Sequence, residues 1–256
     1  MTTPLFQSFT RNTRGRDYAV GDIHGCFQAL DEALAALAFD PNTDRVFSVG
    51  DLIDRGPQSE QFAQYLELPW FFAVRGNHDQ MMLDAALDPA WNQNWQDNGG
   101  GWASAFTLAE RTVWCDRLST LPLAIEVATR DGPVGLVHAN PMASTWAEVR
   151  DRLAPRSGQL PNLDDADRLL TGMLWSRTLV NHMEKAHREG IFMAPIPDLH
   201  ALVMGHTVTE APLHVANLWA IDTGACYRCA TSALTLLNLQ DLSLYQHPLP
   251  GPNRLQ

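Results

Sequence analysis

One stretch, residues 50–56, constrains the fold of this chain more than any other. Its sequence is Gly50-Asp51-Leu52-Ile53-Asp54-Arg55-Gly56, and it directly follows residues 45–49, a β-branched and aromatic run typical of a buried strand. Its carboxylates are therefore expected just past the carboxyl end of a strand, where α/β proteins bind ligands. Alone the stretch is a weak signal, because Gly and Asp are also ordinary turn residues.

The same order of strand, polar turn and helix recurs along the chain, which predicts an α/β fold. Strands are expected over residues 17–20, 45–49, 70–74, 133–137, 200–204, 218–221 and 234–237. Helices are expected over residues 26–38, from Pro57 through Leu66, from Met82 to Leu87, and over 102–109, 144–153 and 166–170.

A chain of 256 residues that is 45% hydrophobic can bury one sizeable core, so we expect a single domain over residues 1–256. Residues 1–16 and 246–256 are interpreted as polar tails. The periodicity fades over residues 88–120 and 141–195, which we interpret as irregular lobes near a substrate cleft.

The formal net charge of −11 argues against a nucleic-acid partner, because phosphate contacts need clustered Lys and Arg, and only 18 are spread along the chain. A negative protein that handles phosphate needs local positive charge, which bound metal ions can supply. No run approaches the roughly 18 apolar residues of a membrane span, so no membrane partner is expected.

The four cysteines are too few and too scattered for a disulfide framework, and they favour a cytoplasmic location. Cys226 and Cys229 form a single Cys-x-x-Cys pair without a second pair or a His partner at zinc spacing. We therefore interpret these two as incidental thiols rather than as a metal site.

Five strand ends deliver carboxylate, amide and imidazole groups to what we expect to be one rim. Such donors, without a thiolate, suit manganese, iron or zinc. Two ions about 3.5–4 Å apart, bridged by a carboxylate such as Asp51, would activate a shared hydroxide for direct in-line attack at phosphorus. The candidate metal ligands are Asp22, His24, Asp51, Asn77, His138 and His206.

The neighbours of these ligands fit the other roles of phosphoester hydrolysis. Arg55 offers a planar fork for phosphate oxygens, and Arg177 could close on the same group. His78 could protonate the leaving oxygen as general acid, with Asp54 holding its other nitrogen. Each residue alone also fits a purely structural role, as a half-buried histidine or a carboxylate in a turn. Five such positions, each directly after an apolar strand, favour a shared functional site.

Three motifs together resemble the phosphoprotein phosphatase (PPP) family of calcineurin-like metallophosphoesterases: residues 21–25 (Gly-Asp-Ile-His-Gly), 50–56, and 76–79 (Gly-Asn-His-Asp). The chain is similar above all to the small bacterial and lambda-phage type of Ser/Thr/Tyr protein phosphatase. That likeness includes Asn98-Gly99-Gly100-Gly101-Trp102, Val137-His138-Ala139, Trp175-Ser176-Arg177, Gly205-His206-Thr207 and Ile221-Asp222-Thr223-Gly224-Ala225, and spans roughly residues 17–240.

The resemblance implies a metallophosphatase fold, a central β-sandwich flanked by helices in four layers, αββα. It also implies a dinuclear site commonly active with manganese, with iron, zinc, nickel and cobalt as other options. Asp22, His24 and Asp51 would hold one ion, and Asp51, Asn77, His138 and His206 the other. His78 with Asp54 would form the acid pair, and Arg55 with Arg177 the phosphate clamp.

Three departures from the family pattern bear on these roles. Asp79 stands where the family usually has Glu, and Asn140 stands where relatives tend to have Asp or Gly. A region of variable length precedes Arg177, so that Arg168 or Arg188 could compete for its role.

Three functions compete. The first is a metal-dependent protein phosphatase, expected to be a monomer, acting on phosphoserine, phosphothreonine and also phosphotyrosine in proteins or peptides. The second is a symmetrical diadenosine polyphosphate hydrolase, whose members tend to have Ala-Arg where this chain has Asp54-Arg55, so Asp54 favours the phosphatase. The third, a non-catalytic metal-binding scaffold, is disfavoured because every ligand and the acid are present.

Overall fold

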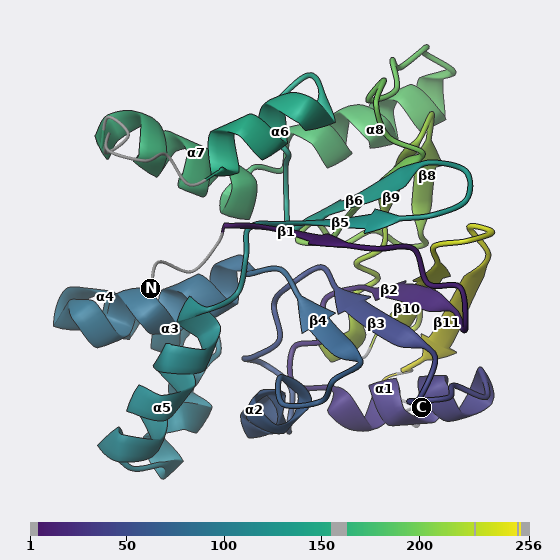
Figure 1. Cartoon of the computed structure of the whole chain (residues 1–256). Coiled ribbons are helices and arrows are strands. Elements are labelled where there is room, and N and C mark those ends of the chain that lie inside the picture. The colour runs from purple at the N-terminus through teal and green to yellow at the C-terminus, as the bar shows by residue number, and fades with distance from the viewer. Residues whose placement is uncertain (1–4, 155–162, 228, 250, 252–256) are drawn as a thin grey trace.

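Two β-sheets pack face to face between helices in the computed structural model, which describes residues 5–154, 163–227, 229–249 and 251 (Figure 1). The six-stranded sheet has the order β1 (Phe6–Phe9), β5 (Ala124–Ala128), β6 (Pro133–Val137), β7 (Ala201–Met204), β9 (Leu218–Ala220) and β8 (Leu213–Val215). The five-stranded sheet has the order β11 (Leu244–Pro248), β10 (Ala233–Asn238), β2 (Asp17–Val20), β3 (Arg45–Ser48) and β4 (Phe71–Ala73).

Helices cover the outer faces of both sheets and form a lobe at one side (Figure 1). The helices α6 (Trp146–Leu153), α7 (Leu163–Trp175) and α8 (Thr178–Glu189) lie over the six-stranded sheet. The helices α1 (Phe27–Ala36) and α2 (Phe62–Tyr65) lie over the five-stranded sheet, and α3 (Asn77–Leu87), α4 (Pro89–Asp97) and α5 (Leu108–Ser119) form the lobe. Short 3₁₀ helices are η1 (Ser59–Gln61), η2 (Gly100–Ala105) and η3 (Ala225–Tyr227). The four-layer sandwich expected from the sequence is therefore confirmed.

The inner strands are apolar on both faces because each sheet is covered on both sides. On β3, Val46 packs into the cluster beneath α1, whereas the next residue, Phe47, packs into the cluster between the sheets. On β6, Leu136 faces the other sheet and Val137 faces the outer helices. Successive side chains of a strand point to opposite faces of the sheet, and here both faces are covered by other parts of the protein.

The topology brings several strand ends to one place. The strands β2, β3 and β4 are parallel neighbours, and so are β6, β7 and β9. Their carboxyl ends therefore lie at the same edge of each sheet. The two edges meet, since His138, just after β6, contacts the backbone oxygen of Val49, just after β3, at 2.8 Å.

Several edge and lobe elements differ from the sequence expectation. The segment 1–16, interpreted as a polar tail, contains β1, which pairs in parallel with the unpredicted strand β5. The strand β11 extends into the expected tail 246–256 and pairs with β10. Both are short edge strands with mixed exposure, so they carry little apolar periodicity. Residues 1–4, 250 and 252–256 of these tails lie outside the described residues.

The two lobes are more helical than predicted. The expected helix over 102–109 is wrong: η2 ends at Ala105, and α5 begins after Thr107. Thr107 and Glu110 form a capping box, in which each side chain bonds the other's backbone N–H, so a helix start is fixed there. The helices α4 and α8 and the strand β8 were not predicted.

No described helix is both long enough and apolar enough to cross a membrane.

Candidate metal centre

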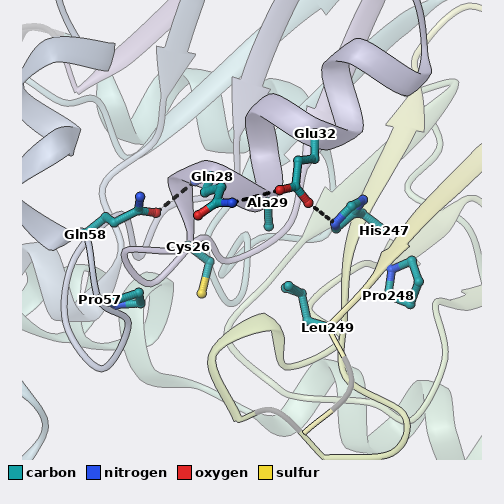
Figure 2. Close-up of a pocket in the computed structure, with 9 residues that line it drawn as sticks. All are labelled: Cys26, Gln28, Ala29, Glu32, Pro57, Gln58, His247, Pro248 and Leu249. Carbon is teal, nitrogen blue, oxygen red and sulfur yellow. Dashed lines mark hydrogen bonds and ion pairs between the residues drawn. The ribbon is translucent and has the colours of Figure 1, made fainter. Parts of the chain in front are cut away.

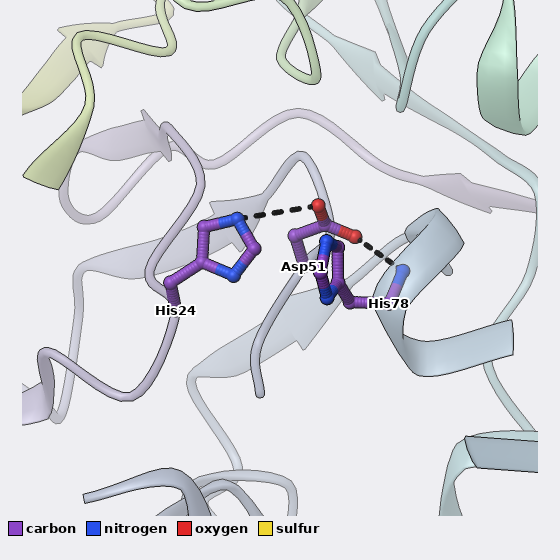
Figure 3. A group of neighbouring side chains, drawn as sticks. All are labelled: His24, Asp51 and His78. Carbon is purple, nitrogen blue, oxygen red and sulfur yellow. Dashed lines mark hydrogen bonds and ion pairs between the residues drawn. The ribbon is translucent and has the colours of Figure 1, made fainter. Parts of the chain in front are cut away.

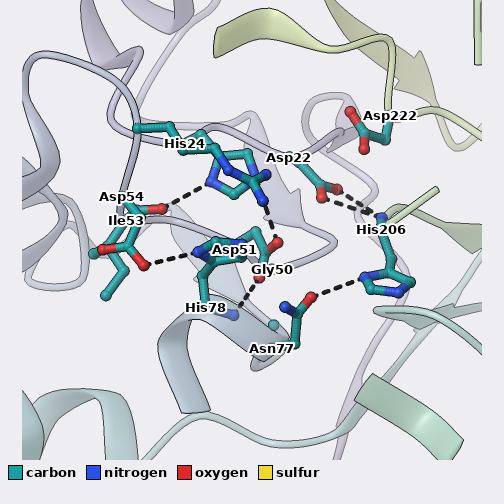
Figure 4. A network of polar contacts seen from close by, with 12 residues as sticks. Asp22, His24, Gly50, Asp51, Ile53, Asp54, Asn77, His78, His206 and Asp222 are labelled. Carbon is teal, nitrogen blue, oxygen red and sulfur yellow. Dashed lines mark hydrogen bonds and ion pairs between the residues drawn. The ribbon is translucent and has the colours of Figure 1, made fainter. Parts of the chain in front are cut away.

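The six predicted ligands come together at the joined edges of the two sheets. Figure 4 shows five of them, Asp22, His24, Asp51, Asn77 and His206. Each lies in a turn after a strand or, for Asn77, at the first residue of α3. All six side chains are buried. The sequence prediction that separate strand ends meet at one rim is therefore confirmed, while the role of each residue stays a prediction.

The turns that carry these residues have an unusual backbone. His24, Asp51 and His206 have φ of 44°, 51° and 65°, in the left-handed region that side chains other than glycine rarely adopt. Such strain persists only where surrounding contacts hold it, and it clusters at functional sites. One such contact is the hydrogen bond from the His24 backbone N–H to the Asp51 backbone oxygen, at 2.8 Å.

Asp79 fixes the turn after β3 through backbone hydrogen bonds. Its Oδ2 accepts from the N–H groups of Gly76 (2.8 Å) and Asp51 (3.1 Å), and its Oδ1 accepts from that of Leu52 (3.1 Å). Asp79 stands where the family usually has Glu, and its shorter side chain accepts all three of these backbone hydrogen bonds. The positioning role itself was missed from the sequence.

Asp51 lies between two imidazole groups. Its Oδ2 is 3.4 Å from His24 Nε2, and its Oδ1 is 3.4 Å from His138 Nε2. Figure 3 shows the carboxylate between His24 and the start of α3, where the His78 backbone N–H donates to Oδ1 at 2.9 Å. One oxygen directed to each side is the geometry that a bridging carboxylate needs.

On one side of Asp51, unprotonated nitrogen atoms converge on an amide oxygen. His138 donates its Nδ1–H to the Val49 carbonyl oxygen (2.8 Å), and His206 donates its Nε2–H to the Trp175 carbonyl oxygen (3.1 Å). The other nitrogen of each ring then carries a lone pair. These two atoms, His138 Nε2 and His206 Nδ1, lie 2.9 and 2.8 Å from Asn77 Oδ1. Three acceptors that face one another fit a cation among them.

Burial keeps these imidazoles neutral. It lowers the pKa of His24 to about 3 and that of His206 to about 3, and it also lowers the pKa of His138. Neutral imidazole is the form that binds metal ions, so no proton must leave these rings at neutral pH.

The carboxylates of the site repel one another. Burial, with the charges of Asp222 and Asp51, raises the pKa of Asp22 well above its usual value. Burial also raises the pKa of Asp222 to about 6. Buried carboxylates crowded in this way need positive charge, and divalent ions supply it. The donor chemistry therefore fits the metal ions that the sequence predicted.

Metal affinity is expected to rise as the pH increases from 5 to 8. The carboxyl groups of Asp22 and Asp222 have raised pKa values, so they hold protons in mildly acidic solution and must lose them when a cation binds. Calorimetric titration of the metal-free protein with Mn²⁺ measures this. Asp222→Asn removes one repelling charge and should shift the increase in Mn²⁺ affinity to lower pH. An affinity for Mn²⁺ that does not change between pH 5 and 8 would contradict the prediction.

His78 lies beside the same centre but is engaged differently. Its Nδ1 is 2.7 Å from Asp54 Oδ2, and both side chains are buried. Its ring meets that of His24 edge to face at 4.7 Å, close enough for His24, Asp51 and His78 to form a second possible ligand group. Because Asp54 holds the Nδ1 side, we favour the acid role for His78 over a ligand role.

The two predicted phosphate-binding arginines border the centre. Arg55 donates an Nη1–H to His24 Nε2 at 2.8 Å, and its guanidinium lies over the Tyr227 ring at 5.5 Å. A cavity of about 400 Å³ opens beside it. Arg177 is exposed and donates to the His206 backbone oxygen at 3.1 Å.

The two competing arginines do not contact the centre in the described part of the chain. Arg188 pairs with Glu189 at the end of α8, and Arg168 lies exposed on α7. Of the three candidates, Arg177 is thus the one that the fold places at the site.

A separate cavity of about 240 Å³ lies between α1, the turn at Pro57 and β11 (Figure 2). Its walls carry an ion pair between Glu32 and His247 at 3.0 Å, but no Arg or Lys. It therefore lacks the cations that a phosphoester needs.

Asp222 was missed as a site residue. It lies beside Asp22 (Figure 4), and its Oδ1 accepts from the Gly224 backbone N–H at 2.9 Å. The sequence signal was available, since Asp222 follows an apolar strand as the predicted ligands do.

Gly205→Ala is expected to destabilise the protein by about 1–3 kcal/mol, the usual cost of overpacking. A Cβ at this position would lie 2.0 Å from Asp22 Oδ1 and 2.6 Å from a Val49 methyl carbon. Urea unfolding of the metal-free protein measures the loss. Gly101→Ala is the matched control, because a Cβ there meets no atom within 4 Å. Equal stability of the two variants would show that the turn after β7 relaxes freely.

Comparisons with known proteins identify relatives of this chain. Residues 18–210 match the family of calcineurin-like phosphoesterases. Serine/threonine-protein phosphatase 1 of Salmonella typhimurium is 36% identical over 230 residues, which cover 87% of this chain and 91% of the relative. A symmetrical bis(5'-nucleosyl)-tetraphosphatase of Dechloromonas aromatica is 44% identical over 145 residues, which cover 56% of this chain and 50% of the relative.

Solved structures share the whole fold at low identity. A crystal structure with a provisional assignment as a diadenosine tetraphosphatase has a TM-score of 0.62 at 21% identity, covering 98% of this chain and 99% of that chain. At this identity the likeness establishes the fold alone.

Proposed function

The chain belongs to the calcineurin-like phosphoesterase family, and from this premise we propose that it is a metal-dependent protein phosphatase acting on phosphoserine and phosphothreonine. As a member, the chain is a metallophosphoesterase, and the family implies divalent metal ions. We propose further that the site binds two ions, that manganese is the preferred metal, and that the chain forms one catalytic domain. Phosphotyrosine is a further substrate of the same proposal.

The observation that carries the proposal is the buried pair of His78 and Asp54, 2.7 Å apart beside the candidate metal ligands. A serine or threonine alkoxide is a poor leaving group and needs a proton as its bond to phosphorus breaks. The leaving group of a dinucleotide polyphosphate is itself a phosphate and needs this help far less. A positioned acid therefore favours a phosphomonoester of an alcohol.

The proposed roles follow the positions of the side chains. Asp51 would be shared by two ions, of which Asp22 and His24 would hold one and Asn77, His138 and His206 the other. Bound ions would supply a nucleophilic water at neutral pH and offset the charge of the phosphoryl group. Arg55 and Arg177 bind and orient the phosphate oxygens, since each contacts a candidate metal ligand, Arg55 through His24 and Arg177 through the His206 backbone oxygen.

His78 protonates the leaving oxygen through Nε2, because Asp54 holds Nδ1. No side chain of the proposed site acts as a nucleophile, so no phosphoenzyme is formed.

The alternative is symmetrical hydrolysis of diadenosine polyphosphates, favoured by the relative from Dechloromonas aromatica. Its match covers only half of that relative, whereas the match to the Salmonella phosphatase covers nine-tenths of it. We therefore place this activity second and a non-catalytic scaffold third.

The test compares two substrates under one condition. Metal-stripped protein receives Mn²⁺ and is assayed in parallel on a phosphoserine peptide and on diadenosine tetraphosphate. We expect peptide turnover that depends on added metal and far exceeds dinucleotide cleavage. Faster cleavage of the dinucleotide would instead support the diadenosine polyphosphate hydrolase. If the protein binds two ions but hydrolyses neither substrate, the non-catalytic scaffold would be favoured.

The proposed partner is a phosphorylated protein or peptide, and the proposed location is the cytoplasm. The location rests on the four cysteines, none of which forms a disulfide in the described part of the chain. The proposed monomeric state is tested by sedimentation of the manganese-loaded protein.

A further inference from the structure

The Asp54 carboxylate is held by two tryptophans as well as by His78. Trp95 donates its indole Nε1–H to Oδ2 at 2.9 Å and lies 3.2 Å from Oδ1. Trp102 donates its Nε1–H to Oδ1 at 2.8 Å. Asp54 itself is 0% exposed, and no Arg or Lys in the described part of the chain pairs with it. The two indoles are thus its side-chain donors apart from His78.

Both indoles come from the lobe over residues 88–120, which the metal ligands do not use. Trp95 lies on α4 and Trp102 in η2, joined by a run of glycines. A Cβ on Gly100 would lie 2.4 Å from the Trp95 ring, and one on Gly99 would lie 2.9 Å from the Arg55 backbone nitrogen. The glycine run is therefore what lets the lobe approach the turn after β3 so closely.

The chemistry of indole suits this position. An indole N–H is a donor only, so it can neither take the proton of His78 nor present a competing acceptor. Hydrogen bonds to a charged acceptor are short and strong, and a buried carboxylate without donors is costly. The Asp54 backbone has a φ of 73°, in the left-handed region, and such a residue keeps its place only through surrounding contacts.

We propose that Trp95 and Trp102 are positioning residues for leaving-group protonation, because their indole N–H groups fix the carboxylate that orients the His78 ring. The inference rests on the proposed acid role of His78. It makes the α4–η2 lobe part of the catalytic apparatus. Loss of either N–H frees the Asp54 carboxylate to rotate, and the His78 ring then loses its fixed direction toward the leaving oxygen.

The test uses Trp95→Phe and Trp102→Phe, which keep an aromatic ring and remove the N–H. We expect turnover of a phosphoserine peptide to fall about 10-fold or more in each, the scale of a hydrogen bond to a charged group. Turnover of p-nitrophenyl phosphate, whose leaving group departs readily without a proton, should fall by less than about 3-fold. A merely structural role would lower both rates equally.

Two controls match the variants. Trp91→Phe changes an exposed tryptophan of the same helix and should leave both rates unchanged. Trp114→Phe changes a buried ring 5.3 Å from that of Trp102 that makes no bond to Asp54, and it reports the effect of lost packing alone. Metal content is measured for every variant, so that a loss of ions is not mistaken for a loss of positioning.

A second readout needs neither activity nor metal. In ¹H–¹⁵N spectra of the metal-free protein, the Nε1–H signals of Trp95 and Trp102, assigned from the two Phe variants, should shift upfield in Asp54→Asn, because the acceptor loses its charge. The Trp91 signal should stay in place. Unchanged signals for both bound indoles would overturn the hydrogen bonds on which the inference depends.

The outcomes separate this inference from the proposed function. If His78→Asn affects the peptide and the aryl phosphate equally, the acid role fails and the inference fails with it. If His78→Asn affects the peptide selectively but neither Trp variant does, the proposed function stands and the positioning role is wrong. Selective loss in all three variants, with the controls unchanged, supports both.

Discussion

Asp51→Asn is expected to lower the affinity for both metal ions by at least about 100-fold. Loss of a residue that merely supports a metal ligand lowers affinity by up to about 100-fold, and loss of a ligand should cost more. The carboxylate directs one oxygen toward His24 and the other toward His138, each at 3.4 Å. The amide has the same shape but no charge, and it offers an oxygen to one side only. Metal analysis after dialysis against Mn²⁺ measures the loss, and turnover should fall with it.

The same variant should lose little stability relative to the wild type when both are metal-free. Asp51 is among the charges that raise the pKa of Asp22, so its removal relieves repulsion. This gain offsets the loss of the contacts with His138, His78 and His24 that hold the pKa of Asp51 below its usual value. Asn also tolerates the left-handed backbone of this position. The control is Asp17→Asn, which breaks a buried ion pair with Arg45 (2.8 Å) away from the site and should destabilise the fold while keeping both ions. Full metal content in Asp51→Asn would exclude the bridge.

The metal ligands could be predicted from the sequence because each follows an apolar strand or opens the helix after one. Parallel strands bring such positions to one edge whatever the details of the loops. His138 and His206 are 68 residues apart, yet both converge on Asn77 because β6 and β7 are neighbours in one sheet. Local patterns therefore sufficed for the place of the site.

The contacts that hold the site could not be predicted in this way. Asp79 lies three residues after the N-cap of α3, a usual place for an acidic side chain at a helix start. Its bonds to Asp51 and Leu52, however, reach a turn 28 and 27 residues earlier in the chain, respectively. The pattern of apolar and polar residues near Asp79 does not predict contacts this far apart in the sequence. The same holds for the indole bonds from Trp95 and Trp102 to Asp54.

Edge elements were missed for a different reason. The strands β1 and β11 are short, and both have mixed exposure. Each exists because a neighbouring strand offers its backbone groups, β5 for β1 and β10 for β11. Tertiary pairing thus overrides weak local preference, as it does for most edge strands.

His78→Asn is expected to lower turnover of a phosphoserine peptide by about 10²- to 10⁴-fold, the usual range for loss of a general acid. His78 Nδ1 lies 2.7 Å from Asp54, and the amide N–H groups of Asn are not acidic enough to protonate a leaving oxygen. The backbone N–H that bonds Asp51 Oδ1 at 2.9 Å remains, so the metal ions should stay bound. Steady-state kinetics with Mn²⁺ on the peptide and on p-nitrophenyl phosphate measure the effect, which should be much smaller on the aryl ester.

The double variant His78→Asn with Asp54→Asn decides whether the two residues act as one unit. If Asp54 works only through the His78 ring, the double variant should be no slower than His78→Asn alone. Additive losses would give Asp54 a separate role, for example in holding the turn that carries Arg55. His187→Asn, an exposed histidine on α8, is the surface control and should keep full activity. Near-normal peptide turnover in His78→Asn would remove this residue from the acid role.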